Sequence, residues 1–449
     1  MFLSPSLSIS KSSAFFILIS ILTINLSAVE DCCGGQLNEG VVNTLDEKAF
    51  LKEDSAPVLA SPISSESKTL KALLIAGGCC HDYATQTKIL SKGIQERANI
   101  RVDVAWTRDQ DHNTSLPIFK NPDWAKGYDL IIHDECAAVN KDETILNNIL
   151  KAHQTVPAVH LHCAIHSFRG SDNQWHEHIG LSSTKHGPHV PIAVEVLEPK
   201  HPITKTLDNW VTDKEELYNN AEVYGATPIA MGTQKYKRNG KDITDKAIVA
   251  WVNTKYGAPS FSTSMGHFTH NVEAPRYLEL VTRGALWACG KLSSPSYHQP
   301  YTGDNTVIEM PFDTVLKTSA TTSQEGKMAA FAIDGDSETR WCASSAKKPT
   351  WFQLEFLRMT SLSAIEIEWE IQNQWTQYSI ETSRDGKNWK LLFDASKNTT
   401  AGTRKDLAKI QYMRYMRINI LGQEKDMWPS IREIRLYDYT GTELTLKNK

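Results

Sequence analysis

The sequence predicts an α/β domain built on a parallel sheet, followed by an all-β sandwich. At 449 residues the chain is too long for one hydrophobic core, since domains average roughly 150 residues. Up to about residue 290, short apolar runs alternate with stretches of helical spacing, whereas beyond residue 305 apolar residues recur with a period of two. A composition of 41% hydrophobic and 22% charged residues is ordinary for globular domains.

The first domain is predicted to extend over residues 69–290. Continuous apolar runs bounded by turn residues are typical of parallel strands that helices cover on both faces. The predicted strands are Ala72–Ala76, Ile100–Trp106, Tyr128–His133, Pro157–His162, Ile192–Val196, Ala247–Val252 and Ser260–Ser264. The predicted helices are Thr85–Arg97, Asp142–His153 and Ala274–Cys289, the last of which ends at Gly290.

The N-terminal residues predict export. Lys11 precedes an apolar run from Ala14 to Ile24, and Leu26-Ser27-Ala28 offers small residues for cleavage. So short a run is typical of a secretory signal peptide, and it leaves no membrane span in the mature chain. We therefore expect residues 1–28 to be a signal peptide, 29–68 a flexible polar leader, and the protein to be secreted or periplasmic.

Charge and cysteine content narrow the expected partners and cross-links. A formal net charge of -4 provides no broad basic surface, so nucleic acid is not an expected partner. Eight cysteines in an exported chain suggest disulfides, but adjacent pairs such as Cys79-Cys80 cannot easily bridge internally. We therefore expect one or two long-range bridges at most, and the sequence gives no indication of oligomeric state.

Residues that bind metals or transfer protons follow four of the predicted strands. They are His81 after the first strand, His133 and Glu135 after the third, His162, Cys163 and His166 after the fourth, and His267 after the last. In parallel sheets, ligands bind beyond the carboxyl ends of the strands, so these side chains are expected at one edge. Imidazole and thiolate suit zinc or a similar transition ion, and His with Glu can also transfer protons without a metal. A third interpretation is that these side chains only form hydrogen bonds with one another and with buried backbone groups.

Several other polar residues frame this predicted pocket. Glu216 and Tyr218 are two apart on a predicted strand, so they face the same side and join the candidate catalytic set. A loop after the fourth strand contains Trp175, His176 and His178, and it either covers the site or lies on the surface. The segment His186–His189 is predicted to form a fixed turn. His112 and His153 are expected to be exposed to solvent.

A series of short motifs runs through the first domain. In order they are Gly77-Gly78 with His81-Asp82-Tyr83, His162-Cys163-Ala164, His201-Pro202-Ile203, Glu216-Leu217-Tyr218, Trp251 with Tyr256-Gly257, Gly266-His267 and Gly284-Ala285-Leu286-Trp287. This series resembles the ThuA-like (trehalose-utilisation) family, whose fold is flavodoxin-like and related to class I glutamine amidotransferases. The resemblance implies a role in sugar metabolism, and two longer pieces, 162–167 and 186–189, resemble a subset found in exported bacterial proteins.

The first domain lacks the sequence pattern that forms the nucleophile elbow of the amidotransferases. The segment His160-Leu161-His162-Cys163-Ala164 lacks both glycines of their Gly-x-Cys-x-Gly, and no His-x-Glu partner follows a later strand. Because an activated thiol needs a positioned base, neither acyl-enzyme chemistry at Cys163 nor a working glutamine amidotransferase is expected.

Residues 291–305 are rich in Ser, Pro, Tyr and Gly and predict a linker, and residues 306–442 predict the sandwich. Its expected strands are Trp351–Phe356, Ala364–Trp369, Gln377–Thr382, Trp389–Phe393, Tyr415–Ile420 and Ile431–Tyr437. The segments 332–341, 378–389, 415–418 and 431–434 resemble the coagulation factor 5/8 type C (discoidin-like, galactose-binding-like) family, which implies a jelly-roll sandwich.

This second resemblance implies two sites. The family pattern places a structural calcium ion on Asp334, Asp336, Thr339 and Glu433, and carboxylates with a hydroxyl do suit a hard cation; the alternative is a hydrogen-bonded loop without metal. Many members bind glycans through loops at one end of the sandwich. The candidates here are Trp375 and Trp428 for stacking, with Arg404 as a hydrogen-bond donor.

Two functions follow from these observations. The favoured one is an exported carbohydrate-processing enzyme, of hydrolase or isomerase type, that acts on a sugar or oxidised sugar while the sandwich holds a glycan nearby. The alternative is a non-catalytic protein that binds carbohydrate or a surface partner. A cysteine-dependent hydrolase is a weaker third hypothesis.

Overall fold

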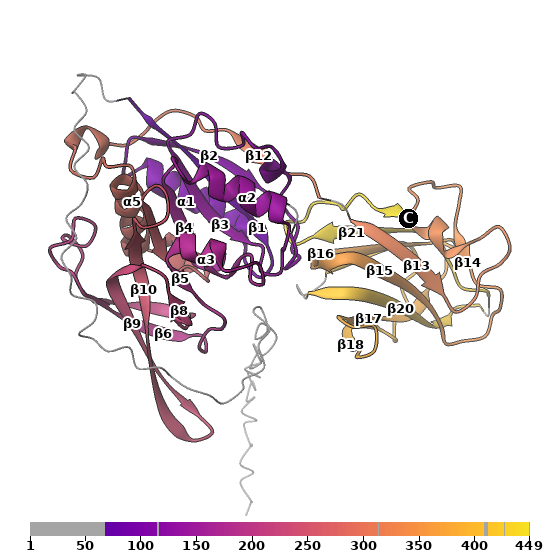
Figure 1. Ribbon diagram of the computed structural model, residues 1–449. Coiled ribbons are helices and arrows are strands. Elements are labelled where there is room, and N and C mark those ends of the chain that lie inside the picture. The colour runs from indigo at the N-terminus through magenta and orange to yellow at the C-terminus, as the bar shows by residue number, and fades with distance from the viewer. Residues whose placement is uncertain (1–67, 115, 313, 408–411, 426, 449) are drawn as a thin grey trace, which may run out of the picture.

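The computed structural model describes residues 68–448 except 115, 313, 408–411 and 426 (Figure 1). The predicted signal peptide and leader, apart from Lys68, lie outside the described residues, as do Cys32 and Cys33. In the described part, no helix has both the length and the apolar character needed to cross a membrane.

The N-terminal domain contains the predicted parallel sheet. Five parallel strands have the spatial order β2-β1-β3-β4-β11, with the crossovers of a flavodoxin-like fold. They are β1 (Leu70–Gly78), β2 (Ile100–Trp106), β3 (Leu130–Cys136), β4 (Ala158–Leu161) and β11 (Ser260–Thr263). The fold class predicted from the apolar runs is therefore confirmed.

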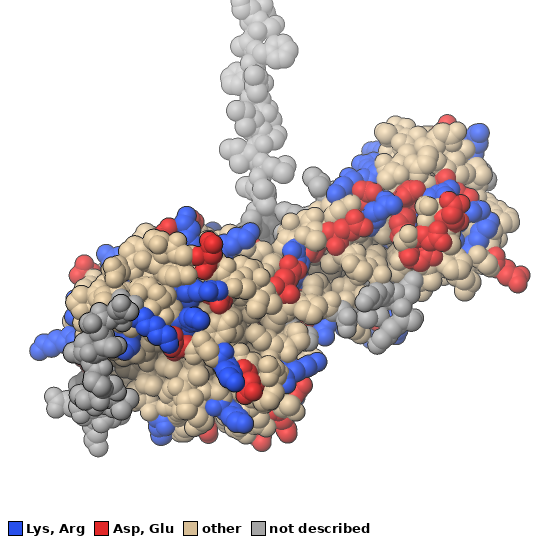
Figure 2. All heavy atoms as spheres, turned by 90° about the horizontal axis from the view of Figure 1, so that it is seen from above, with Lys and Arg blue, Asp and Glu red and all other residues tan. Residues whose placement is uncertain are grey.

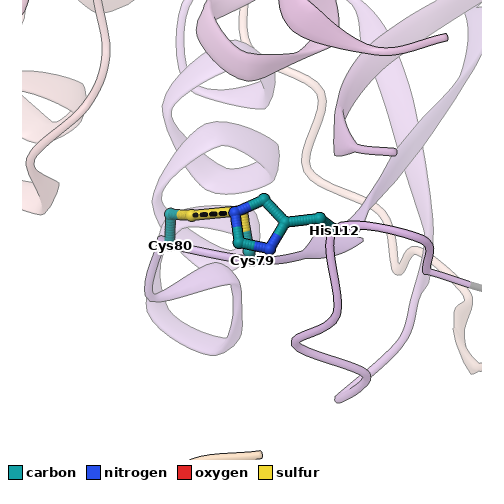
Figure 3. A group of neighbouring side chains, drawn as sticks. All are labelled: Cys79, Cys80 and His112. Carbon is teal, nitrogen blue, oxygen red and sulfur yellow. Dashed lines mark hydrogen bonds between the residues drawn. A yellow bond between two sulfur atoms is a disulfide. The ribbon is translucent and has the colours of Figure 1, made fainter. Parts of the chain in front are cut away.

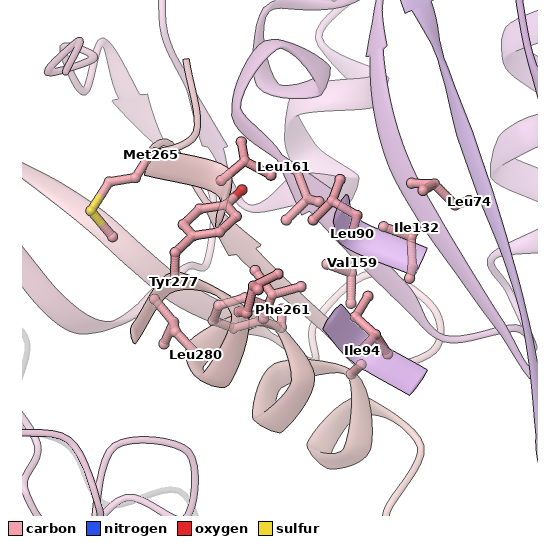
Figure 4. Close-up of a cluster of buried hydrophobic side chains, with 14 of the residues drawn as sticks. Leu74, Leu90, Ile94, Ile132, Val159, Leu161, Phe261, Met265, Tyr277 and Leu280 are labelled. Atoms are coloured by element: carbon pink, nitrogen blue, oxygen red, sulfur yellow. The ribbon is translucent and has the colours of Figure 1, made fainter. Parts of the chain in front are cut away.

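Helices cover both faces of this sheet. They are α1 (Tyr83–Gln95), α2 (Glu143–Ala152), α3 (Gln174–Ile179), α4 (Thr269–Glu273) and α5 (Pro275–Ala288), with 3-10 turns η2 (Pro117–Lys120) and η3 (His162–His166). On one face Leu90 and Ile94 of α1 and Leu280 of α5 pack on Ile132 and Phe261 (Figure 4). Burying one such side chain contributes about 1.5–3 kcal/mol, so this core holds the strand ends in place.

Antiparallel strands extend the sheet beyond β11 in the order β10-β9-β6-β7. Their bounds are β6 (Val190–Val196), β7 (Trp210–Glu215), β9 (Thr227–Arg238) and β10 (Lys241–Asn253), beside a small pair, β5 (Leu181–Ser182) and β8 (Glu222–Val223). This extension matters for the site because β7 ends at Glu215, immediately before Glu216.

The C-terminal domain is the predicted β-sandwich. Its two main sheets have the orders β18-β17-β20-β15-β13-β22 and β14-β21-β16-β19. The strands are β13 (Val315–Ala320), β14 (Trp341–Cys342), β15 (Thr350–Thr360), β16 (Leu362–Trp369), β17 (Thr376–Ser383), β18 (Lys390–Ala395), β19 (Arg404–Leu407), β20 (Met413–Gln423), β21 (Ser430–Asp438) and β22 (Lys447–Asn448), with the 3-10 turn η5 (Ala329–Ala332). Trp341, Trp369 and Tyr378 are buried between them.

The segment between the domains differs from the prediction. Strand β12 (Val307–Glu309), assigned to the sandwich from sequence, instead pairs in parallel with β2 in the N-terminal sheet. The predicted linker is also packed there: the 3-10 turn η4 (Pro295–Tyr297) ends in buried Tyr297, whose carbonyl accepts from the Asn99 amide at 3.0 Å. The linker was predicted from its polar, Pro-rich composition, and composition does not show which backbone groups form hydrogen bonds.

The sandwich contacts the carboxyl-end loops of β1 and β2. Tyr412 Oη and the Cys80 amide are 2.6 Å apart. Two ion pairs cross the same interface, Arg108–Asp438 at 3.3 Å and Arg358–Asp109 at 3.2 Å. Figure 2 shows both signs of charge dispersed over the N-terminal domain, and acidic side chains gathered on the sandwich.

Candidate metal centre

Five histidines and one glutamate meet at the carboxyl edge of the parallel strands. His81 follows β1, His162 follows β4 and His267 follows β11, whereas Glu216 follows β7 of the antiparallel extension. His186 and His189 come from the loop before β6. We call these six residues, together with Tyr218, the histidine centre. It contains five of the residues predicted from sequence, namely His81, His162, Glu216, Tyr218 and His267.

Three of these imidazoles are arranged as metal ligands. One nitrogen from each of His81, His162 and His267 lies within 4.8 Å of the other two. His81 Nδ1 is 3.1 Å from the His267 carbonyl, and His162 Nδ1 is 2.7 Å from the Ser264 carbonyl. Because a carbonyl only accepts, each Nδ1 carries a proton, so Nε2 is the nitrogen through which either imidazole would bind a metal. His267 Nδ1 is buried and faces Glu216 Oε2 at 3.4 Å.

Glu216 supplies the negative charge of the centre. Its carboxylate is almost fully buried, and its oxygens lie 3.5 Å from His162 Nε2 and 3.4 Å from His267 Nδ1. Burial alone would raise the pKa of Glu216, but hydrogen bonds from His162, His189 and His267 hold it well below the usual value. Burial lowers the pKa of His162, yet the Glu216 contact outweighs this and raises it. Because the pKa of His162 is raised, a cation that binds to this imidazole would displace a proton.

Tyr218 and Glu215 each contact a part of the centre that carries a histidine. Tyr218 Oη lies 3.1 Å from His162 Nε2, and its ring stacks on His166 with centroids 3.8 Å apart. His166 is thus behind Tyr218 rather than at the centre. Glu215, which the sequence analysis did not select, accepts the amides of Gly266 at 3.0 Å and His267 at 3.1 Å. It fixes the turn that carries His267.

His133 and Glu135 are not part of the histidine centre. They lie on the opposite face of the sheet, in a second cluster with His153, His160 and His178, all buried. The prediction ended the third strand at His133, whereas β3 continues to Cys136, so alternate residues point to opposite faces. His153, expected in solvent, is fully buried and 2.9 Å from His133.

This second cluster is hydrogen-bonded internally. His153 Nδ1 donates to the Val156 carbonyl at 2.8 Å, so its Nε2 must accept from His133 Nε2. His133 Nδ1 is then 2.8 Å from Glu135 Oε1, and this contact needs one proton beyond a neutral imidazole and a carboxylate. The pair therefore has a structural role as a proton-sharing pair in the core. The predicted loop over the pocket also belongs here, since Trp175, His176 and His178 form the buried helix α3.

Four cysteines lie beside the site histidines. Cys79 and Cys80 form a disulfide, contrary to the expectation that adjacent cysteines would not bridge, and Cys136 pairs with Cys163. Cys79 Sγ is 3.4 Å from Cys136 Sγ, and His112 Nε2 is 3.9 Å from Cys80 Sγ (Figure 3). Each bridge includes a neighbour in sequence of His81 or His162, so the disulfides brace the two loops that carry these ligands. Gly78 permits the close approach, because a Cβ there would lie 2.2 Å from the Cys136 carbonyl oxygen.

The predicted calcium ligands also come together. Thr339 Oγ1 donates to both Asp334 oxygens at 2.9 Å, and Glu433 Oε2 accepts the Gly335 amide at 3.0 Å. Burial and the Asp334 charge raise the pKa of Glu433, although two backbone amides oppose this. Asp336 holds the same loop through its carbonyl, 3.0 Å from Thr339 Oγ1. A cleft of about 530 Å³ opens beside these residues.

The candidate sugar-binding residues lie at one end of the sandwich. Trp428 is 49% exposed and therefore accessible for stacking. Trp375, half-buried, bridges to Ala401, three residues before Arg404. Arg404 is held at 2.7 Å from Asp406 and at 3.0 Å from Asn398. Trp375 precedes β17 and Trp428 precedes β21, whereas contacts with the N-terminal domain come from the opposite strand ends.

Comparison with protein families agrees with both folds. The family model for trehalose utilisation (ThuA) matches residues 71–288, and the model for the F5/8 type C domain matches residues 316–434. The chain is a ThuA-like domain followed by an F5/8 type C domain. Comparison with curated proteins gave no match.

Solved structures similar to the chain include three sugar-binding modules. A chitosan-binding module 2 of a chitosanase/glucanase from Paenibacillus sp. IK-5, in complex with chitotriose, is 20% identical over 27% of this chain and 95% of that one, with a TM-score of 0.25. A pectin-binding module is 26% identical over 30% and 94%, with a TM-score of 0.24. A Clostridium perfringens module in complex with GalNAc-β-1,3-galactose is 18% identical over 27% and 94%, with a TM-score of 0.25.

The ThuA-like domain has no free thiol at Cys163, which was one of the candidate catalytic residues. We expect Cys163→Ala to destabilise the protein by about 3 kcal/mol, the entropic cost of opening a disulfide loop of this length. The bridge closes a sequence separation of 27 residues. Urea unfolding measures the stability, and metal content should persist because Cys163 is not a ligand. A variant of unchanged stability that loses its metal would contradict this structural role.

Proposed function

We propose that the protein is an exported carbohydrate-processing enzyme, of hydrolase or isomerase type, whose ThuA-like domain holds a transition ion such as zinc. The observation that supports it most directly is the convergence of His81, His162 and His267, each within 4.8 Å of the others. The Nδ1–carbonyl hydrogen bonds of His81 and His162 leave Nε2 as the metal-binding nitrogen, as second-shell acceptors do in zinc sites. The proposed substrate is a sugar or an oxidised sugar.

The donor set fits such an ion. Three imidazoles with one carboxylate suit zinc, and a cation would balance the charge of the buried Glu216 carboxylate that faces His162 and His267. When bound, the ion would act as a Lewis acid on a carbonyl or hydroxyl oxygen. The protein itself provides Tyr218, which can hold or pass a proton at Oη beside His162.

The F5/8 type C domain is proposed to bind glycan through Trp375, Trp428 and Arg404. These residues lie at the strand ends distant from the ThuA-like domain, and β21 alone has 9 residues between the two ends. At about 3.3 Å per residue the separation is about 26 Å. A single sugar ring could not contact both sites, so the geometry favours a polymer or a crowded glycan surface as the target.

A calcium ion is proposed for the loop at Asp334, Asp336, Thr339 and Glu433. Two carboxylates of like charge face each other there, and the Asp334 charge contributes to the raised pKa of Glu433. A hard cation would remove this repulsion and join the loop to β21. Its proposed role is structural.

Metal analysis tests these assignments. We expect mature protein purified without chelator to contain a transition ion by mass spectrometry, and His81→Ala, His162→Ala and His267→Ala to lose it. His270→Ala is the matched control, because His270 is exposed on α4 close to the centre. Calcium should remain in all four variants and disappear in Asp334→Asn.

The same samples distinguish the alternative function. Incubation of each variant with aldoses, ketoses and oxidised sugars in D₂O, followed by NMR, detects both deuterium uptake beside a carbonyl and bond cleavage. Turnover in the wild type and the control, but not in the metal-free variants, would support an enzyme. Folded protein without a transition ion in the wild type would contradict the proposal and favour a non-catalytic glycan-binding protein.

A further inference from the structure

Glu216 is approached by imidazoles on both of its oxygens. Oε2 faces His162 and His267, as described above. Oε1 faces a different pair, His189 Nε2 at 2.7 Å and His186 Nδ1 at 3.4 Å. His186 Nδ1 also donates to the Gly187 carbonyl at 2.8 Å, so His186 would bind a cation through Nε2. A carboxylate with two separate nitrogen sets on its two oxygens has the arrangement of a bridging ligand between two cations.

The second set satisfies the same distance criterion as the first. One ligand atom from each of His186, His189 and Glu216 lies within 4.8 Å of the other two. We propose that the histidine centre binds two divalent transition ions, one on His81, His162 and His267 and the other on His186 and His189, with Glu216 bridging them. The inference builds on the proposed function, because it adds a second ion to the same centre.

The loop that carries the second pair is held in place before any metal binds. The Gly187 amide donates to the Leu217 carbonyl at 2.8 Å, and His186 pairs with Tyr218 as a β-bridge. Buried Gln234 donates from Nε2 to the Val190 carbonyl at 2.8 Å and to the Glu215 carbonyl at 2.9 Å. The loop is thus tied to the same segment that carries Glu216, which is the preorganisation that a metal site needs.

The two positions differ in their access to solvent. The side chains of His162, His267 and Glu216 are at most 3% exposed, whereas those of His186 and His189 are 14% and 21% exposed. The second ion would therefore face solvent and the incoming substrate, with coordination positions left open, as catalytic metals require. We expect it to exchange more readily than the inner ion.

Stoichiometry decides the proposal. Metal-stripped protein is titrated with Co²⁺ in the presence of excess calcium, which occupies the sandwich, and binding is followed by calorimetry and visible absorption. We expect two equivalents for the wild type and for His270→Ala, and one for His186→Ala and His189→Ala. His189→Gln, a milder change, should behave like His189→Ala, and circular dichroism verifies that each variant is folded.

Magnetic coupling provides a second readout. Two Co²⁺ ions joined by a carboxylate couple, so the electron paramagnetic resonance signal per cobalt should be weaker at two equivalents than at one. A wild type that binds a single ion, or a His189→Ala variant that still binds two, would overturn the second site while leaving the proposed function intact. Binding of none would overturn both.

Discussion

Glu216→Gln will abolish high-affinity metal binding at both positions of the histidine centre. The amide keeps the shape of the side chain but removes a carboxylate that faces four imidazoles. We expect a loss of at least on the order of 100-fold in affinity. The thermal stabilisation by metal, about 2.7 kcal/mol at a metal concentration of 100 times the dissociation constant, should disappear with it. Thermal unfolding with and without added Zn²⁺ measures this difference.

Glu215→Gln is the matched control for this experiment. The neighbouring carboxylate contacts the amides of Gly266 and His267 rather than imidazole nitrogens. Its replacement should weaken binding by only about 10- to 100-fold, through misplacement of His267, and leave a metal-dependent rise in Tm at high Zn²⁺. Equal losses in the two variants would show that Glu216 acts only by holding the fold together.

Acidification will destabilise the protein steeply, even without metal. Burial lowers the pKa of His153 well below its usual value and the pKa values of His176 and His178 to about 4. The unfolded chain takes up protons at these positions below about pH 6.5 while the folded one does not, so stability is retained above that pH and falls below it. Between about pH 7.5 and 5.5, three such histidines lower the unfolding free energy by about 4 kcal/mol.

The slope of stability against pH identifies the residues responsible. Urea unfolding of His178→Gln across this range should show a dependence weaker by about one proton than in the wild type. His270→Gln, which changes an exposed imidazole, should leave the slope unaltered. His162, whose pKa is raised, acts in the opposite direction and reduces the total effect. An unchanged slope in His178→Gln would refute the assignment.

The sequence was sufficient to predict the five parallel strands, although β3 continues beyond its predicted end and two other predicted strands belong to the antiparallel extension. Apolar runs located β1 to β4 because parallel strands are buried on both faces, and the rule that sites lie at carboxyl ends then selected His81, His162 and His267. Family resemblance added the flavodoxin-like fold and the sandwich, and both are confirmed.

Other parts of the site depend on information that a linear pattern lacks. His133 and Glu135 were misplaced because the pleat, not proximity to the strand end, decides which face a residue takes. His186, His189 and Glu215 were not among the candidate catalytic residues. Their segments are brought together by the antiparallel pairing of β6 with β7 and by hydrogen bonds from Gln234, which the sequence does not show. The fixed turn predicted at His186–His189 is held as expected, but its position beside Glu216 follows only from the tertiary fold. The disulfide between Cys79 and Cys80 depends on local backbone geometry at Gly78.

The pairing of β12 with β2 determines where this chain can be divided. A fragment that ends at residue 288, where the ThuA match ends, would leave the outer edge of β2 without its neighbour. Bare strand edges pair with other chains, so such a fragment should aggregate on expression. A fragment that continues through Met310, whose amide donates to the Trp106 carbonyl at 2.6 Å, keeps that edge closed. Any rearrangement that moved the ThuA-like domain into another protein would therefore have to carry this strand with it.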